Sequence, residues 1–277
     1  MMILYDMPMH EYQSAQGVSK SALDQTDKSP AHYLHWLQEP EPEPTDAMQT
    51  GKAFHMAVLE PDLFESEVIT APEVNKRTNK GKQELKDFHA EHSDKLILRP
   101  DQTEIVQAMR DSIYQHRAAR ACLSAAGFPE VSVFWEDFVT GETLKCRPDY
   151  WRQDNIILDL KAVRDASPEG FRKAIFNYRY HVQAALYQDG VQEAYGERPQ
   201  GFIFVACEKE PPYMVGVYTL DLQSLQLGHM EYRRNLETLN RCKATNRFPG
   251  YGDEIQEIEP PVWAKKKLEQ QEEPLYE

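Results

Sequence analysis

Residues 147–161 read RPDYWRQDNIILDLK, and this stretch decides how the rest of the sequence is interpreted. The polar triplet Gln153-Asp154-Asn155 is typical of a turn. It separates two runs, 143–151 and the largely apolar 156–161, which we expect to form consecutive strands. The stretch therefore predicts a sheet in which charged side chains lie close to a tight connection.

The charged side chains of these two strands are expected to meet. Side chains alternate between the faces of a strand, so Asp159 and Lys161 project from one face, and Asp149 lies near the end of the preceding strand. Two carboxylates and the backbone carbonyl of Leu160 would provide an all-oxygen ligand set that suits Mg²⁺ or Mn²⁺. A lysine beside that ligand set can orient an attacking water or help to deprotonate it.

A plainer interpretation of Asp159 and Lys161 is an ion pair at the end of a strand. An acidic residue two positions before a lysine also occurs by chance, as in Glu84-Leu85-Lys86, which lies in a polar, helix-like stretch. However, an aspartate inside the apolar run 156–160 requires a strong partner once it is buried. This requirement favours a functional site.

Around this stretch the sequence predicts a layered α/β domain with a helical N-terminal part. Serine caps indicate helix starts at Ser19, Ser29 and Ser167, and the last of these helices is expected to reach about Tyr195. We expect a single domain over residues 1–264, with a motif core at about 46–220 and a polar tail over 265–277. Further expected elements are helices over 46–59 and 101–121, a strand over 131–136 that forms a three-strand meander with 143–151 and 156–161, strands over Gly201–Cys207 and Met214–Leu220, a long helix from about Asp221, a proline-rich linker over 39–44 and a basic polar loop over 75–82.

Composition excludes several classes of protein. The chain has 277 residues with 41% hydrophobic and 27% charged residues, which is a globular composition, and no run approaches the length of a membrane span. The four cysteines are far apart, so a zinc ribbon or iron–sulfur cluster is not expected, and we expect a cytoplasmic chain with reduced thiols. The net charge of −14 argues against a protein that coats nucleic acid, but not against an enzyme that acts on it.

Four further residues are candidates for the same site. Gln183 and Tyr187 are one helical turn apart and share a face of the helix. They either contact a phosphate or the lysine, or simply form a half-buried polar face. Glu130 opens the first expected strand and is either a third carboxylate or a solvated strand end. His55 follows Gly51-Lys52-Ala53-Phe54 in a helix and is either a metal ligand or a structural histidine.

In their order along the chain, these residues resemble the motifs of the PD-(D/E)XK nucleases of the RecB-like group. The nearest resemblance within that group is to nuclease domains of the exodeoxyribonuclease VIII (RecE) type, and it covers nearly the whole chain. The motif positions are Gly51-x-x-x-His55, Glu130, Arg147-Pro148-Asp149, Asp159-x-Lys161 and Gln183-x-x-x-Tyr187, and the resemblance extends through Val18-Ser19-Lys20-Ser21, Ser29-Pro30-Ala31, Ala71-Pro72-Glu73, Asn75-x-Arg77-Thr78-Asn79, residues 178–183 and Pro261-x-Trp263-Ala264.

The resemblance implies a mixed central sheet flanked by helices, and a Mg²⁺-dependent exonuclease in which Mn²⁺ substitutes for Mg²⁺. Such an enzyme would degrade one strand of linear double-stranded DNA from 5′ to 3′. It would release mononucleotides and leave a 3′ single-stranded overhang for a RecT-type annealing protein in recombination. The resemblance also implies a toroidal homotetramer whose central channel holds the DNA. The composition adds the expectation that no membrane is a partner.

It further implies roles for individual residues. His55, Asp149, Asp159 and the Leu160 carbonyl would be the metal ligands. Glu130 would be an accessory carboxylate, Lys161 would orient or activate the water, and Gln183 and Tyr187 would support the site and the substrate.

Basic residues that could contact DNA are placed only loosely by the sequence. Lys76 and Arg77, with Lys80 and Lys82, belong to the expected polar loop, while Arg172, Lys173 and Arg179 share the helix of Gln183. Contacts of this kind would be made to phosphates and would not read the base sequence. Two other functions remain open at this point. One is an endonuclease specific for a DNA structure or sequence on the same core, and the other is a non-catalytic DNA-binding module.

Overall fold

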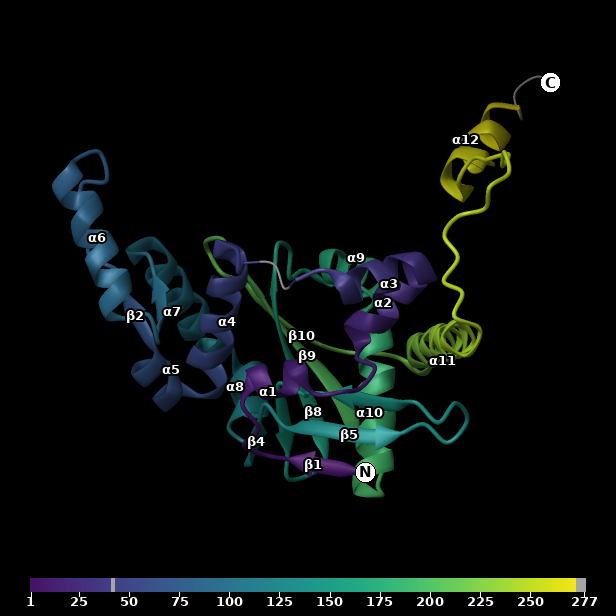
Figure 1. The fold of residues 1–277 in the computed structure, drawn as a ribbon, viewed down its shortest axis with the longest axis horizontal. Helices are drawn as coiled ribbons and strands as arrows, with labels where there is room; N and C mark the ends of the chain where they lie inside the picture. The colour runs from purple at the N-terminus through teal and green to yellow at the C-terminus, as the bar shows by residue number, and fades with distance from the viewer. Residues whose placement is uncertain (41–42, 273–277) are drawn as a thin grey trace.

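A computed structural model describes residues 1–40 and 43–272 of the chain. Its centre is a mixed five-stranded sheet in the order β10-β9-β8-β7-β4 (Figure 1). Strand β8 pairs in parallel with β9 and antiparallel with β7, and the other neighbours are antiparallel. The strands are β4 (Gly127–Pro129), β7 (Tyr150–Arg152), β8 (Ile156–Val163), β9 (Gly201–Glu208) and β10 (Val215–Thr219). The α/β class expected from the sequence is confirmed.

A second sheet corrects the expected three-strand meander. Strands β1 (Met2–Leu4), β5 (Ser132–Glu136) and β6 (Thr143–Cys146) form a separate antiparallel sheet in the order β1-β5-β6. The expected strand 143–151 is wrong as one unit, because residues 147–149 interrupt it and β7 joins the central sheet instead. Pro148 in this interruption has no N–H to offer a ladder, so the pairing stops there and resumes with a new partner.

Helices cover both faces of the central sheet (Figure 1). Ile157 and Val163 of β8 belong to a core shared with α10 and α11, whereas Leu160 belongs to a second core shared with α4 and α7. A strand buried on both faces reads as a continuous apolar run, and β8 departs from that pattern at Asp159 and Lys161. The helices are α4 (Asp46–Leu59), α7 (Pro100–Gln115), α8 (Arg117–Leu123), α9 (Pro168–Asn177), α10 (Tyr180–Tyr195) and α11 (Leu222–Thr245).

Two long helices expected from the sequence are divided. The expected helix 167–195 becomes α9 and α10, because Arg179 adopts a left-handed backbone with φ of 55° between them. The expected helix 101–121 becomes α7 and α8, with the extended backbone of His116 at the junction. The helix expected over 46–59 is α4 and has those limits.

The N-terminal helices are positioned by their expected caps. Ser19 caps α2 (Lys20–Lys28) through Ala22 N–H, and Ser29 caps α3 (Pro30–Gln38) through His32 N–H. A short helix, α1 (Met9–Ser14), precedes them. The expected linker 39–44 falls partly on residues 41–42, which lie outside the described residues.

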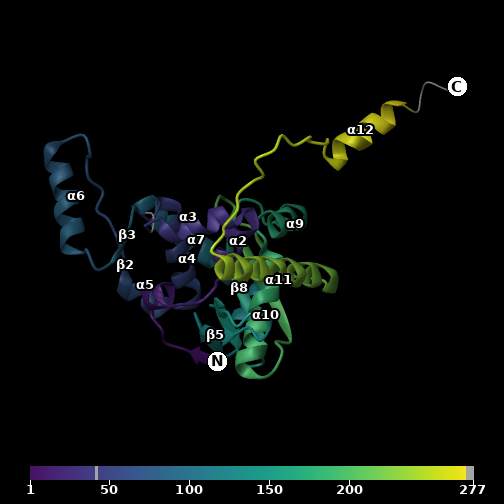
Figure 2. The same ribbon diagram turned by 45° about the vertical axis from the view of Figure 1, so that its right-hand side comes forward.

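An arm made of α5 (Pro61–Glu67), β2 (Val68–Thr70), α6 (Asn79–Glu91) and β3 (Leu96–Leu98) is inserted between α4 and α7. Its two strands pair in parallel. Both views show α6 standing away from the central sheet (Figures 1 and 2). The expected loop 75–82 is correct only up to Thr78, because the Thr78 hydroxyl caps Gly81 N–H and the chain is helical from Asn79.

The C-terminal segment leaves the body after α11 and ends in α12 (Val262–Glu272), as Figure 2 shows. The expected polar tail 265–277 therefore begins inside a helix, and residues 273–277 lie outside the described residues. None of the helices in the described part of the chain combines the length and the apolar character that crossing a membrane would require.

Candidate active site

The interruption between β6 and β7 and the middle of β8 together position the site. Asp149 directly precedes β7, and its Oδ2 accepts a hydrogen bond of 2.6 Å from the backbone N–H of Leu160. This bond fixes the Asp149 carboxylate against the middle of β8. The antiparallel pairing of β7 with β8 brings Asp149 close to Asp159 and Lys161.

Asp159, Lys161 and Gln183 form a closed polar triad on the α10 side of the sheet. Lys161 Nζ lies 2.5 Å from Asp159 Oδ2 and donates to Gln183 Oε1 at 3.0 Å. The Gln183 amide nitrogen donates to Asp159 Oδ1 at 2.6 Å. The ammonium group also lies 4.7 Å from the centre of the Tyr180 ring. Gln183 thus holds both charged groups in one arrangement.

His55, Glu130 and Asp149 form a neighbouring cluster with the donor set of a metal site. One ligand atom from each lies within 4.8 Å of the other two. His55 Nδ1 is 3.5 Å from Asp149 Oδ2. Carboxylate oxygens with one imidazole suit a small divalent cation such as Mg²⁺ or Mn²⁺, so these residues fit the metal that the motifs imply.

The acid groups of this cluster are crowded. Burial raises the pKa of Glu130 to about 8, and the nearby Asp149 carboxylate adds to the effect while Arg147 opposes it. Burial likewise raises the pKa of Asp149 to about 6, against the lowering influence of Lys161 and the Leu160 N–H. Such raised values mean that the carboxylates lack enough positive charge, which a bound cation would supply.

The other groups have pKa values that suit a ligand and an orienting cation. Burial lowers the pKa of His55 to about 4, with a further contribution from Lys161, so the imidazole is neutral and able to bind a metal. Burial alone would lower the pKa of Lys161, but Asp159 and Asp149 outweigh it and raise the value above the ordinary range. Burial raises the pKa of Asp159 to about 6, opposed by Lys161.

The structure therefore brings the expected site residues together but divides them into two groups. Glu130, expected as an accessory carboxylate, lies with His55 and Asp149 among the clustered donors. Asp159 is fully buried, and both of its oxygens are engaged by Lys161 and Gln183. Leu160 borders the cluster through its backbone N–H, which donates to Asp149 Oδ2. The individual ligand roles stay predictions.

Tyr187 lies one turn after Gln183 but is packed into the core. Its ring centre is 6.3 Å from that of Phe202, and burial raises the pKa of its hydroxyl. Asp159 and Asp149 contribute to this rise, so the phenol lies within electrostatic range of the site.

Arg147 belongs to a motif quoted from the sequence, but the sequence analysis gave it no role at the site. Its Nε donates to Glu130 Oε2 at 2.8 Å, and its NH1 donates to Ser132 Oγ at 2.6 Å and to the Met7 carbonyl at 2.8 Å. Glu130 itself has a left-handed backbone with φ of 51°, so Arg147 holds a carboxylate that sits at a tight bend. The available signal was its position immediately before Pro148-Asp149. Glu60, whose charge raises the pKa of Glu130, gave no such signal.

The expected DNA-binding residues lie in three different environments. Lys76 and Arg77 are exposed on the arm, and Arg172 and Lys173 are exposed on α9, where Lys173 pairs with Glu169 at 2.8 Å. Arg179 is different. Its guanidinium pairs with Asp27, with Asp24 at 3.2 Å and with Glu231 at 3.6 Å, and it donates to Asn235 Oδ1 at 2.7 Å. It thus cross-links α2, α10 and α11, and these contacts with three carboxylates give it a structural role.

Comparisons with known proteins agree with this geometry. A family model described as a PDDEXK-like domain of unknown function (DUF3799) matches residues 19–260. A crystal structure described as a putative exonuclease from Eubacterium rectale superposes with a TM-score of 0.62 at 14% sequence identity, over 94% of this chain and 98% of that chain. The structure of SSO0001 superposes with a TM-score of only 0.28 at 12% sequence identity, over 78% of this chain and 84% of that chain. The search of curated proteins found no match.

The family match and the site arrangement point in the same direction. The match spans α2 through the segment after α11, and it includes every residue of the triad and of the donor cluster. The superposition shows that the fold is shared with a solved structure over nearly its full length. The chain belongs to the family of PDDEXK-like domains.

Proposed function

We propose that this chain is a divalent-metal-dependent nuclease that hydrolyses linear double-stranded DNA from an end. The observation that carries the proposal is that the Asp159–Lys161–Gln183 triad adjoins the His55–Glu130–Asp149 cluster, because Leu160, between Asp159 and Lys161, donates its N–H to Asp149. Phosphodiester hydrolysis needs such a combination, because a cation must meet the charge that develops on the phosphate and a donor must orient the water.

The reaction adds water across one phosphodiester bond. The water oxygen bonds to phosphorus while the bond from phosphorus to the leaving oxygen breaks. The water gives up one proton to the solvent, and the leaving oxygen takes up one proton to become a hydroxyl group. A divalent cation held by His55, Glu130 and Asp149 would supply Lewis-acid stabilisation of the phosphate charge. Lys161, kept protonated by Asp159 and Asp149, would donate a hydrogen bond that orients the water or a phosphate oxygen.

Gln183 would act through the two groups that it contacts. By accepting from Lys161 and donating to Asp159, it prevents the ammonium from rotating away from the cluster. Its position on α10, which is packed into the larger core, gives that restraint a rigid support.

The finer features of the proposal rest on the resemblance to RecE-type nuclease domains. They are Mg²⁺ as the working cation, 5′ to 3′ degradation with mononucleotide release, a 3′ overhang taken up by a RecT-type annealing protein, and a homotetrameric ring. The description of the Eubacterium rectale protein as a putative exonuclease supports end-dependent cleavage over internal cleavage.

The test follows uniformly labelled DNA, in linear and covalently closed forms, incubated with Mg²⁺. We compare the unaltered chain with Asp159→Asn and with the matched control Asp154→Asn, an acid at the exposed turn before β8. Release of mononucleotides from linear DNA only, lost in Asp159→Asn and kept in Asp154→Asn, supports the proposal. Cutting of closed DNA would favour an endonuclease. Binding of DNA with no turnover of either form would leave a non-catalytic module.

A further inference from the structure

The tip of the arm carries four positive charges that form no ion pair within the part of the chain that the structure describes. Lys76, Arg77, Lys80 and Lys82, called here the basic tip, are all exposed. None of the four forms an ion pair with any residue in 1–40 or 43–272. In a chain with a net charge of −14, four unpaired cations within seven positions are a local exception.

Local hydrogen bonds hold the backbone of the basic tip in a defined conformation. Asn75 Oδ1 accepts from Arg77 N–H at 3.1 Å, and the Thr78 hydroxyl donates to the Asn75 carbonyl at 3.0 Å and accepts from Gly81 N–H at 3.0 Å. A Cβ on Gly81 would lie 2.3 Å from the Asn75 carbonyl oxygen, so only glycine permits this close approach. The four cations are therefore carried on a tight turn and the first helical turn that follows it.

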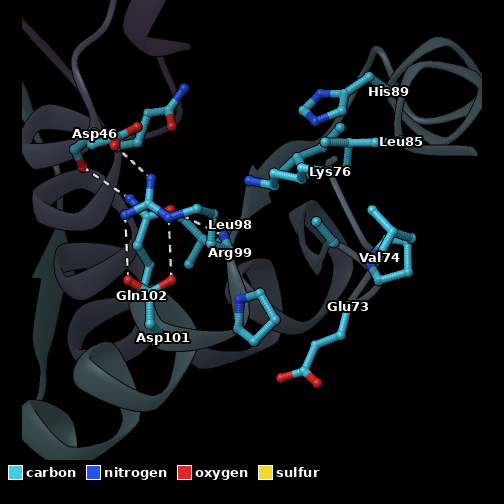
Figure 3. Close-up of a pocket in the computed structure, with 15 residues that line it drawn as sticks. Asp46, Glu73, Val74, Lys76, Leu85, His89, Leu98, Arg99, Asp101 and Gln102 are labelled. Carbon is cyan, nitrogen blue, oxygen red and sulfur yellow. Dashed lines mark hydrogen bonds and ion pairs between the residues drawn. The ribbon is translucent and has the colours of Figure 1, made fainter. Parts of the chain in front are cut away.

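An open groove of about 730 Å³ lies between this arm and the start of α4. Figure 3 shows Lys76 and His89 on one side and Arg99, tied to Asp46 and Asp101, on the other. Arg99 is occupied by these carboxylates, with Arg99 Nε donating to Asp101 Oδ1 at 3.1 Å. Lys76 is thus the free cation on a wall of the groove, among the residues that the structure describes.

The groove and the donor cluster are linked by one helix. Asp46 begins α4 and lines the groove, while His55 lies on the same helix. At a rise of 1.5 Å per residue the two are separated by about 14 Å along the helix axis. This length corresponds to about four base pairs, because a B-DNA strand carries one phosphate per 3.4 Å of axis. A single duplex is therefore long enough to reach both places.

We propose that the basic tip binds the phosphate backbone of the duplex whose cleaved bond lies at His55, and that it does so without reading base sequence. The proposal rests on the nuclease function proposed above and names a second contact region for the same substrate. Lysine and arginine side chains bind phosphate through charge and release counterions from the DNA. The tip supplies affinity and position, while the chemistry stays with the triad and the donor cluster.

The test measures equilibrium binding of a 30-base-pair duplex of arbitrary sequence at several salt concentrations. All binding variants carry Asp159→Asn in the full-length chain, so that cleavage does not interfere. The tip variant combines Lys76→Ala, Arg77→Ala, Lys80→Ala and Lys82→Ala. A charge-retaining version replaces the three lysines by arginine. The matched control, Lys209→Ala with Lys265→Ala, Lys266→Ala and Lys267→Ala, removes four exposed charges elsewhere.

We expect the tip variant to bind the duplex about 10- to 100-fold more weakly near 0.1 M salt. The slope of log affinity against log salt should fall in magnitude by up to about 3.6, at about 0.9 for each lost phosphate contact. The arginine version and the control should bind as the parent does. Equal affinity and slope in the tip variant and the control would overturn the proposal.

A second readout separates this proposal from the nuclease function. The tip variant with Asp159 restored should hydrolyse a small substrate, thymidine 5′-(p-nitrophenyl phosphate), at the rate of the unaltered chain, because that substrate does not reach the tip. A lower rate on this ester would show damage to the site and would overturn a role confined to DNA binding. If the unaltered chain cleaves neither DNA nor the ester, the nuclease proposal fails, while the binding measurements still decide the role of the tip.

Discussion

Replacing Arg147 by glutamine tests whether this arginine maintains the donor cluster. Arg147 donates to Glu130 Oε2, Ser132 Oγ and the Met7 carbonyl, and little of the pair is exposed: 10% of the Arg147 side chain and 15% of the Glu130 side chain. Removing one partner of a buried ion pair costs about 3–5 kcal/mol when the other charge stays buried, and protonation of Glu130 brings the loss toward the lower end of that range. For a chain of this size that loss corresponds to a fall in Tm of about 10 °C.

The same change weakens metal binding for a separate reason. Arg147 is the group that holds down the pKa of Glu130, which burial and Asp149 already raise to about 8. Without the guanidinium, that pKa rises further, so at pH 7.5 a still larger fraction of Glu130 is protonated and a cation displaces its proton at a greater cost in free energy. Loss of a group that supports a metal ligand typically reduces affinity about 10- to 100-fold.

The assay is titration of Mn²⁺ by calorimetry at pH 7.5, with thermal unfolding of the metal-free and metal-bound protein alongside. Arg110→Gln is the matched control, because Arg110 pairs with Asp111 on the surface. We expect the control to behave as the unaltered chain. A variant at Arg147 with unchanged Mn²⁺ affinity and unchanged Tm would refute the role assigned to this residue.

Three further predictions follow from the triad and the donor cluster. Lys161→Ala should lower kcat at least 100-fold and change DNA affinity by less than about threefold, whereas equal losses in both would indicate a phosphate clamp. Gln183→Met removes the hydrogen bonds to Asp159 and from Lys161, so urea unfolding should show a loss of about 2–4 kcal/mol, and an unchanged midpoint would contradict the restraint. Metal affinity should rise between pH 6 and 8 as Asp149 and Glu130, with pKa values of about 6 and 8, lose their protons. A carboxyl whose pKa is raised on folding stabilises the metal-free chain at low pH, and this contribution is lost as the pH rises through the folded pKa. The increase in Tm caused by Mn²⁺ should therefore also grow with pH. An increase in Tm that does not change with pH would count against the raised pKa values of Asp149 and Glu130.

The sequence predicted those parts of the fold that local signals specify. Helix α4 has the limits expected for residues 46–59, and Ser19, Ser29 and Ser167 each cap the helix that follows. Asp149, Asp159 and Lys161 could be expected to meet because neighbouring strands and the two-residue period of a strand determine their positions.

Features that depend on distant partners could not be found in this way. Strand propensity indicates that residues 143–151 are extended, but it does not tell which sheet each half joins, so the division at Pro148 was missed. The break at Arg179 depends on its contacts with Asp24 and Asp27, which lie on another helix. The association of Glu130 with Arg147 likewise depends on the folding of two separate sheets around one bend.

The site is assembled from widely separated parts of the chain, and this has a consequence for the cell that makes the protein. His55 comes from the first quarter of the sequence, whereas Gln183 and the β9 strand that pairs with β8 come from the second half. Contacts between such distant segments form only after the intervening chain has been made and ordered. A nascent or partly folded polypeptide therefore lacks the assembled site until synthesis has passed β9, and the proposed nuclease activity would begin only then.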